Sequence, residues 1–278
     1  MAKIRPTAQN TKQDARFRHV VFAQNQVSNT LKVRRINLTK RVKATRIIKL
    51  DTTKSDISEV IIRAGVCSST SILLMIDAST DHFTYVDLYC EEMANLRLVA
   101  FLSGSALNHL EINVHLHGYS ANAKIGMVCI PNHLGASVVH SIQDHTDRLT
   151  VSNLECRAVL THETRMHYHG LISVGKNGVG TDAYQKNANV LLSDRAKVYS
   201  VPKLEISAND VRCTHGSTTS GLSADELFYV SSRGLNPIIA KRTIAHAFLA
   251  PVANMLQNRL LKVKFNDLIE RNIADIIK

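Results

Sequence analysis

The chain has 278 residues, of which 45% are hydrophobic and 21% charged, and this composition excludes an intrinsically disordered protein. Its apolar runs are far shorter than the roughly 18 residues that a transmembrane helix needs, and its basic first segment lacks the apolar core of a secretory signal. The five cysteines are scattered singly, which is typical of a reducing compartment. We therefore expect a cytoplasmic protein, with an organelle stroma as the alternative.

Basic residues are concentrated at the start of the chain. The net charge is +11, and residues 1–50 hold 13 lysines and arginines against one acidic residue, Asp14. Such a segment is either a solvated basic face or a contact for nucleic acid or an acidic partner. Only Phe17 and Phe22 lie in it, which is too few aromatic residues for a single-strand-binding platform. We favour the solvated face and take residues 1–30 as a basic N-terminal lead; a basic nucleic-acid-binding β protein is the alternative.

Short apolar or alternating runs of strand length follow one another from about residue 30 to residue 212. In LEINVHLHG, the apolar residues from Leu110 to Leu116 alternate with the polar residues from Glu111 to His117, as in a strand with one buried face. Polar spacers separate the runs, and no helix-length amphipathic segment interrupts them. The spacing predicts a β-sandwich, a β-barrel or a β-solenoid for residues 31–220. The runs are SILLMID, FTYVDLYC, LRLVAFL, LEINVHLHG, KIGMVCI, RLTVSNL, RAVLT, HGLISV, NVLLS and KLEIS.

Residues 221–278 have the spacing of helices instead. Ser223 stands before two acidic residues and an apolar run, which predicts an N-capped helix that ends at Gly234. Pro237 fits the first turn of a following helix. We therefore expect a C-terminal helical domain over residues 221–278.

Residues 181–235 contain an ordered series of short motifs: TDA (181–183), LLS (191–193), PKLEI (202–206), DVRCTHG (210–216), LFY (227–229) and SRG (232–234). A match over some fifty ordered residues is far more specific than one short motif. With this series the segment closely resembles the SufB/SufD family of iron–sulfur cluster assembly proteins, and a weaker similarity covers about residues 85 to 250.

Within this family the sequence is SufD-like. SufB-type members place a cysteine where this chain has Asn187, and the SufD pattern separates a cysteine and a histidine by one residue, as in Cys213 and His215. Val201 departs from the pattern, because a threonine is usual before the proline. The chain is also short at its N-terminus relative to the family, and we expect it to lack the helical leading domain common in SufD.

The resemblance implies a fold and a role. The fold would be mainly β, a right-handed parallel β-helix (solenoid) core with a C-terminal helical segment. The role would be that of a non-catalytic scaffold subunit in the SUF complex, with a SufB-type subunit (or a homodimer) and a SufC-type ABC ATPase as partners. We expect neither a membrane nor a nucleic acid as a partner.

The resemblance also implies the site residues. The SufB contact would run along the last strands, where Cys213 and His215 would hold transient iron or a nascent cluster, and no cofactor would bind tightly to the isolated chain. The ATPase contact would lie on the helices of about residues 222–250. Its expected residues are Leu222, Glu226, Leu227, Phe228, Tyr229 and Arg233.

The residues themselves leave more than one interpretation of Cys213 and His215 open. A strand places positions i and i+2 on one face, so the two side chains can point together. A thiolate and a neutral imidazole are good ligands for iron or zinc, but two ligands do not complete a site. As nucleophile and base of a β-helix enzyme they would need an orienting acid and oxyanion donors, which the surrounding sequence does not offer. A third interpretation is a cysteine and a histidine packed at a strand end.

Other histidines and cysteines are weaker candidates. The pairs His115/His117 and His167/His169 are each either half of a metal site or polar residues on the solvent face of a strand. Asp144 and His145 could form hydrogen bonds across solenoid rungs. The remaining cysteines adjoin apolar runs and are expected in the core: Cys67, Cys90, Cys129 and Cys156.

Overall fold

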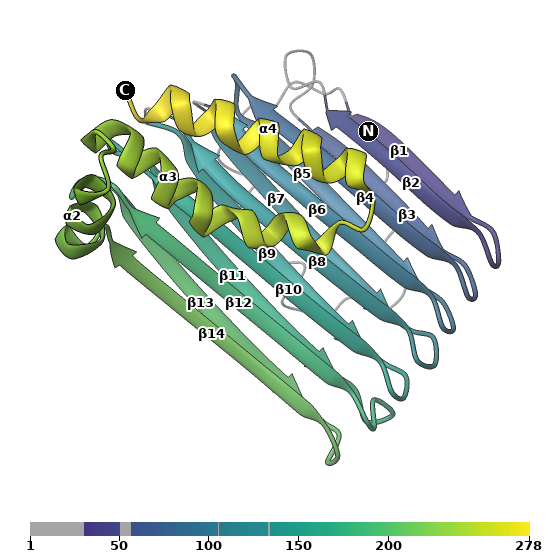
Figure 1. Ribbon diagram of the computed structural model, residues 1–278. Helices are drawn as coiled ribbons and strands as arrows, with labels where there is room; N and C mark the ends of the chain where they lie inside the picture. Colours follow the sequence, from purple (N-terminus) through teal and green to yellow (C-terminus); the bar gives the residue numbers. More distant parts are fainter. Residues whose placement is uncertain (1–30, 51–56, 105, 133) are drawn as a thin grey trace.

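The computed structural model describes residues 31–50, 57–104, 106–132 and 134–278, so the basic lead, residues 1–30, lies outside the described residues. The described strands form two seven-stranded sheets, one of the odd-numbered and one of the even-numbered strands. We call them the odd sheet and the even sheet. The chain crosses from one sheet to the other after each strand, so that one odd and one even strand make a rung (Figure 1).

The strands of each sheet lie in sequence order. The odd sheet contains β1 (Leu31–Leu38), β3 (Ile57–Ala64), β5 (His82–Cys90), β7 (Leu107–Leu116), β9 (Ala136–His145), β11 (Arg165–Val174) and β13 (Lys197–Ile206). The even sheet contains β2 (Lys43–Leu50), β4 (Ser69–Ala78), β6 (Asn95–Gly104), β8 (Asn122–Pro131), β10 (Val151–Leu160), β12 (Asp182–Leu191) and β14 (Arg212–Gly221).

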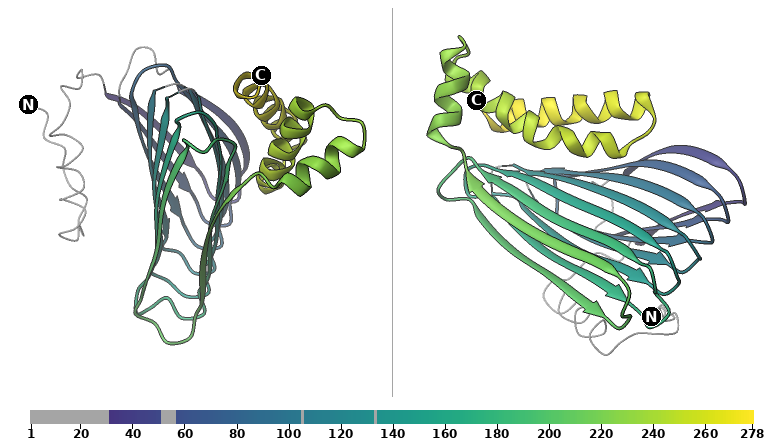
Figure 2. Two further views of the ribbon diagram at one scale, coloured as in Figure 1. Left: turned by 90° about the vertical axis from the view of Figure 1, so that its left-hand side faces the viewer. Right: turned by 60° about the horizontal axis from the view of Figure 1, so that its bottom comes forward.

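All neighbouring strands pair in parallel, and the two sheets face each other across a narrow interior (Figure 2). This confirms the predicted parallel β-helix core with a C-terminal helical segment. One sequence interpretation is wrong in detail, because the runs RLTVSNL and RAVLT belong largely to the single strand β10. Leu154, Cys156 and Ala158 continue one buried row through both runs, while Glu155 and Arg157 stay on the other face.

Aliphatic side chains fill the interior of the early rungs. Ile62, Leu88 and Val114 are fully buried there, in one cluster with neighbours from both sheets. The cysteines at 90, 129 and 156 are also buried, as expected, but Cys67 is not. Cys67 is an exposed turn residue with a φ of 54°. The prediction that it lies in the core was wrong, because a residue next to an apolar run can belong either to the strand or to the turn beside it.

The C-terminal helices are α2 (Ala224–Ser232), α3 (Pro237–Leu249), the 3₁₀ helix η1 (Ala250–Met255) and α4 (Arg259–Ile276). Of these, α3, η1 and α4 cover the outer face of the even sheet (Figure 2). Phe265 of α4 meets Phe101 of β6 edge to face, with ring centroids 6.0 Å apart. Ser223 caps α2 and Gly234 follows the helix with a φ of 89°, as the sequence predicts. The structure adds a capping box, in which Glu226 bonds back to Ser223. No helix in the described part of the chain is both long and apolar enough to cross a membrane.

Candidate functional site

The C-terminal end of the solenoid is open. β13 pairs only with β11 and β14 only with β12, so within the described residues each sheet ends in a strand with one unpaired edge. Every residue of β14 is exposed or half-buried, although the matching row of β12 is buried. The last rung therefore presents both its backbone edge and its inward-facing side chains to the surroundings.

Cys213 and His215 lie on the inward row of this last rung. Their register partners on β12 are Ala183 and Gln185, and both of these are fully buried in the interior. The predicted strand is confirmed, and both side chains occupy one face of it. Cys213 is half-buried and His215 is exposed, because no further rung covers them. Burial raises the pKa of the Cys213 thiol, although the backbone of Ala183 acts in the opposite direction.

The rest of the open end is a mixture of hydroxyl and apolar groups. Ser217 of β14 donates a 2.9 Å hydrogen bond to Ser200 of β13, which ties the two edge strands together across the interior. Leu204 and Ile206 of β13 are 37% and 41% exposed. Their register partners on β11, such as Ile172, are buried, so these side chains are core residues that lack the next rung.

The surroundings of His215 do not resemble a hydrolytic centre. Among the described residues, His215 forms no ion pair or side-chain hydrogen bond. Asp182, whose charge acts on Cys213, pairs instead with Arg212 at 2.5 Å on the neighbouring, outward row. The pair therefore offers two ligand atoms on one face, and a complete metal site would need further ligands from a partner or from another loop.

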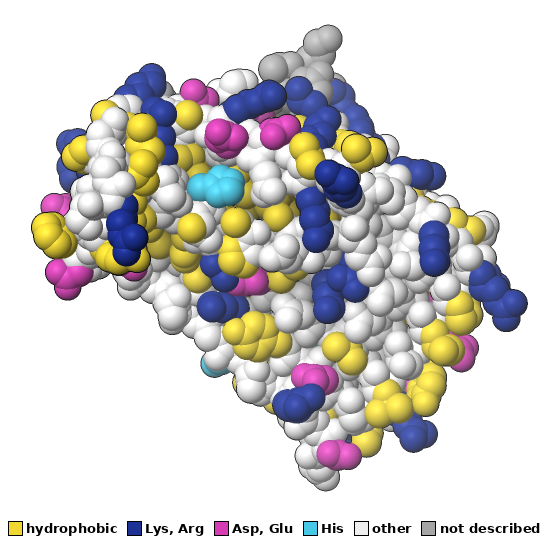
Figure 3. Space-filling view, viewed as in Figure 1, with side chains coloured by type: hydrophobic (Ala, Val, Ile, Leu, Met, Phe, Trp, Pro, Cys, Tyr) yellow, Lys and Arg dark blue, Asp and Glu magenta, His cyan; other side chains and the backbone are white. Residues whose placement is uncertain are grey.

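The opposite end of the solenoid differs in its inward residues. Lys32 and Arg34 of β1, and Arg46 of β2, are register partners of buried residues on β3 and β4, and all three are exposed. Charged side chains at inward positions of an edge strand oppose pairing with another sheet. Lysines and arginines accordingly follow the edge over β1 and β2, on the right of Figure 3.

Exposed apolar side chains gather on α2 and the start of α3, at the left of Figure 3. Phe228 and Tyr229 are 76% and 61% exposed, and α2 buries none of its residues. Ile238 and Ile239, in the first turn of α3, are also exposed. α2 stands away from the sheets beside the open end (Figure 2), so this apolar surface is not used to hold the helix to the solenoid.

The other residues expected on the ATPase contact have mixed positions. Leu222 and Leu227 are half-buried, while Glu226 and Arg233 are exposed. Glu226 accepts a 3.3 Å hydrogen bond from the backbone of Ser223, so its carboxylate has a local role in the cap. The guanidinium of Arg233 lies 5.2 Å from the centroid of the Tyr229 ring. All six residues lie on α2 or directly beside it, and α2 begins shortly after β14, the strand that carries Cys213.

Histidines form two groups on the outer face of the odd sheet. His109, His140 and His169 stack across three neighbouring strands, with centroid distances of 5.2 Å and 4.8 Å. His115 lies further along and pairs with Asp144. Burial opposes the charge of His115, but hydrogen bonds with Asp144 and Asp87 outweigh it and raise its pKa to about 9.

Of the hydrogen bonds across rungs that the sequence analysis considers for Asp144 and His145, the structure shows one for Asp144 and bonds within the rung for His145. Asp144 does bond across rungs, since its Oδ2 lies 3.0 Å from Nε2 of His117, which follows β7. His145 instead points inward, where its two ring nitrogens lie 2.8 Å from the hydroxyls of Thr150 and Ser152. Sequence reasoning missed Asp87 as a further member of the outer group, because Asp87 and His115 are 28 residues apart in the chain and only the pairing of β5 with β7 brings them together.

Comparison with known proteins identifies the family. Residues 35–248 match the SufBD core domain of SUF-system FeS cluster assembly. The iron–sulfur cluster assembly protein SufD of Escherichia coli K12 is 29% identical over 181 residues, which are 65% of this chain and 43% of SufD. The chloroplastic protein ABCI7 of Arabidopsis thaliana is 25% identical over 207 residues, which are 73% of this chain and 43% of ABCI7.

A SufBD family protein of Synechocystis is 38% identical over 89 residues, which are 32% of this chain and 20% of that protein. The chain thus spans less than half the length of each of these relatives. The family match nevertheless covers most of the solenoid and extends into α3. With the parallel β-solenoid that carries it, this match shows that the chain belongs to the SufB/SufD family.

Proposed function

We propose that the chain is a non-catalytic scaffold subunit of the SUF iron–sulfur cluster assembly complex, in the cytoplasm or an organelle stroma. Its open end would pair with a SufB-type solenoid subunit or with a second copy. The surface around α2 would bind a SufC-type ABC ATPase. Cys213 and His215 would supply ligands for iron or a nascent cluster where the two solenoids meet. The observation that carries the proposal is the open last rung with these two side chains on its inward row.

The difference between the two ends of the solenoid supports pairing at the C-terminal end. An exposed strand edge is a template for another strand, and inward-pointing charges are a common device against such pairing. The first rung carries Lys32, Arg34 and Arg46 at inward positions, whereas the last rung carries Cys213, His215 and apolar or hydroxyl side chains. A second solenoid that continued β13 and β14 would cover the apolar residues there.

The incomplete ligand set supports a site shared between subunits. A tetrahedral iron or zinc site needs four ligands, and the described last rung supplies two. Because the partly buried thiol of Cys213 has a raised pKa, metal binding there would have to displace a proton. A partner that contributed thiolate ligands would complete the site. The metal bound there would favour loss of the Cys213 thiol proton.

The proposal is tested by co-expression of the tagged chain with the SufB-type and SufC-type proteins of its host. We expect all three to co-purify and His215→Ala to leave the complex intact while iron and sulfide loading falls. Thr214→Ala is the matched control, because Thr214 is an exposed neighbour on the opposite face of β14. Loading of the His215→Ala complex at the wild-type level would remove His215 from the mechanism, and failure of the wild-type chain to retain either protein would contradict the scaffold role.

A further inference from the structure

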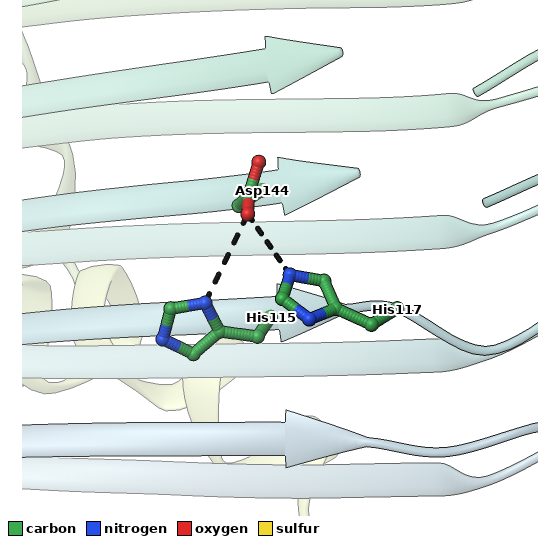
Figure 4. Close-up of side chains that lie close together, drawn as sticks. All are labelled: His115, His117 and Asp144. Atoms are coloured by element: carbon green, nitrogen blue, oxygen red, sulfur yellow. Dashed lines mark hydrogen bonds and ion pairs between the residues drawn. The ribbon is translucent and has the colours of Figure 1, made fainter. Parts of the chain in front are cut away.

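Two histidines and one carboxylate meet on the outer face of the odd sheet, on strands that precede the open last rung. His115 is on β7, His117 follows this strand directly, and Asp144 is on β9 (Figure 4). Asp144 Oδ2 lies 3.0 Å from Nε2 of His117 and 3.9 Å from Nδ1 of His115. One ligand atom from each residue lies within 4.8 Å of the others, and this is the one such group of three found within the described residues.

The geometry is close to that of a metal site. Zn²⁺ bound by imidazole nitrogen and carboxylate oxygen at about 2.0–2.2 Å needs ligand atoms roughly 3.3–3.5 Å apart in a tetrahedron. The two distances from Asp144 lie on either side of this range. The side chain of His117 is 46% exposed and that of Asp144 is 28% exposed, so an ion can reach the group from solvent and a water can complete its coordination.

A second carboxylate holds His115 in the orientation that a ligand needs. Nε2 of His115 lies 3.5 Å from Asp87 on β5, on the other side of the ring from Asp144. A histidine that donates one N–H to a carboxylate presents its other nitrogen to a metal, and such partners are typical of zinc-binding histidines. Asp87 in turn accepts a 3.2 Å hydrogen bond from Asn113, and the Tyr89 ring stacks on His115 with centroids 4.6 Å apart.

The other His-x-His pair of the same sheet lacks these features. His167 and His169 on β11 lie beside the ring of Tyr199, and no carboxylate pairs with them among the described residues. The two pairs have the same spacing, so spacing alone does not make a site. The difference is the aspartate that the next rung places opposite His115.

From this arrangement we propose that His115, His117 and Asp144 form a binding site for a divalent first-row transition-metal ion, Zn²⁺ in particular, with Asp87 as the residue that positions His115. Two imidazoles and one carboxylate suit Zn²⁺ and Fe²⁺, and such ligands bind Zn²⁺ more tightly than Fe²⁺ when both are present. The ion would join β7 to β9 and so clamp neighbouring rungs. This inference does not rest on the proposed scaffold function.

The test is a titration of the metal-free full chain with Zn²⁺ against a chromophoric chelator, and separately with Fe²⁺ without oxygen. We expect one tight Zn²⁺ per chain, and a loss of affinity of at least about tenfold for His117→Ala and for Asp144→Asn. Asp87→Asn should lower the affinity by about 10- to 100-fold, as for other residues that orient a ligand. Zn²⁺ should also raise the melting temperature of the wild type but not that of His117→Ala.

Two controls make the result specific. His167→Ala alters the matched His-x-His pair and should leave Zn²⁺ affinity unchanged. The double variant Cys213→Ser/His215→Ala should also retain the tight site, because the two sites lie on different sheets. Wild-type affinity in both His117→Ala and Asp144→Asn, or loss of the tight site in the double variant, would overturn the proposal. Tighter binding of Fe²⁺ than of Zn²⁺ would overturn the choice of zinc.

Discussion

Gln185 donates a 2.8 Å hydrogen bond to the hydroxyl of Tyr168 inside the solenoid, directly beneath the rung that carries His215. Gln185 is the register partner of His215, and Tyr168 is among the largest fully buried side chains. Ser141 completes the group, with its hydroxyl 3.1 Å from that of Tyr168. A hydrogen-bonded polar group in the interior therefore fixes the position of Gln185, the residue on which His215 of the last rung stacks.

We expect Tyr168→Phe to destabilise the chain by about 1–3 kcal/mol, because it leaves the buried amide of Gln185 with only a 3.3 Å bond to Ser141. The measurement is the free energy of urea unfolding. Tyr199→Phe is the control, since Tyr199 is 55% exposed and its hydroxyl can bond to water, so the change there should be within about 0.5 kcal/mol. Equal stability of the two variants would show that the buried hydroxyl is dispensable.

A charge on the inward row of the last rung should prevent pairing with another solenoid. Ser217→Lys places on β14 the kind of inward charge that Lys32 and Arg46 place on the first rung. Thr218→Lys adds the same charge at the adjacent, outward position and serves as the control. We expect size-exclusion chromatography to show loss of the SufB-type partner or the second copy for Ser217→Lys alone; an intact assembly would place the interface elsewhere.

An acidic residue at Phe228 should weaken ATPase binding without unfolding the chain. Phe228 is 76% exposed, so Phe228→Asp removes little buried surface and should change stability by no more than about 0.5 kcal/mol. Leu260→Asp is matched to it, because Leu260 is 78% exposed but lies on α4. In a pull-down with the SufC-type protein we expect loss of binding for Phe228→Asp alone, and equal retention of both variants would remove α2 from the contact.

The alternation of apolar residues was enough to predict most of the strands, whereas the choice of a solenoid over a sandwich or a barrel came from the family resemblance. In β7, Leu110, Ile112 and Val114 are fully buried as the pattern indicates. Alternation failed where the inward residues are polar, as in β9, where Ser141, Gln143 and His145 face the interior. Their hydrogen bonds come from other strands, such as the bond from Gln143 to Ser152, and a hydrophobic pattern does not contain that information.

The candidate sites show the same limit. The spacing of Cys213 and His215 predicted a shared face, and β14 confirms the strand. That face is exposed because no further rung covers β14 in the described chain. The number of stacked rungs is a property of the whole solenoid, so the local sequence around Cys213 does not reveal it. Asp144 and Asp87 reach His115 from two neighbouring strands, so only the register of the parallel sheet brings them together.

Acidification should destabilise the chain through its buried neutral histidines. Burial lowers the pKa of His109 and that of His145 to about 4, compared with about 6.5 in an unfolded chain. Between these values the unfolded state binds more protons than the folded state, so stability is present above pH 6.5 and is lost as the pH falls toward 4. Each histidine contributes a slope of up to about 1.4 kcal/mol per pH unit in this window.

His109→Phe isolates one of these contributions. Phenylalanine keeps a ring between Phe83 and His140, which lie 5.4 Å and 5.2 Å from the ring of His109, but it does not titrate. His115 does not mask the effect, because its raised pKa leaves it protonated in both states at acid pH and affects stability only as the pH rises above 6.5. We therefore expect urea unfolding at pH 7, 6 and 5 to show a shallower loss of stability for His109→Phe than for the wild type; parallel curves would mean that His109 titrates normally in the folded chain.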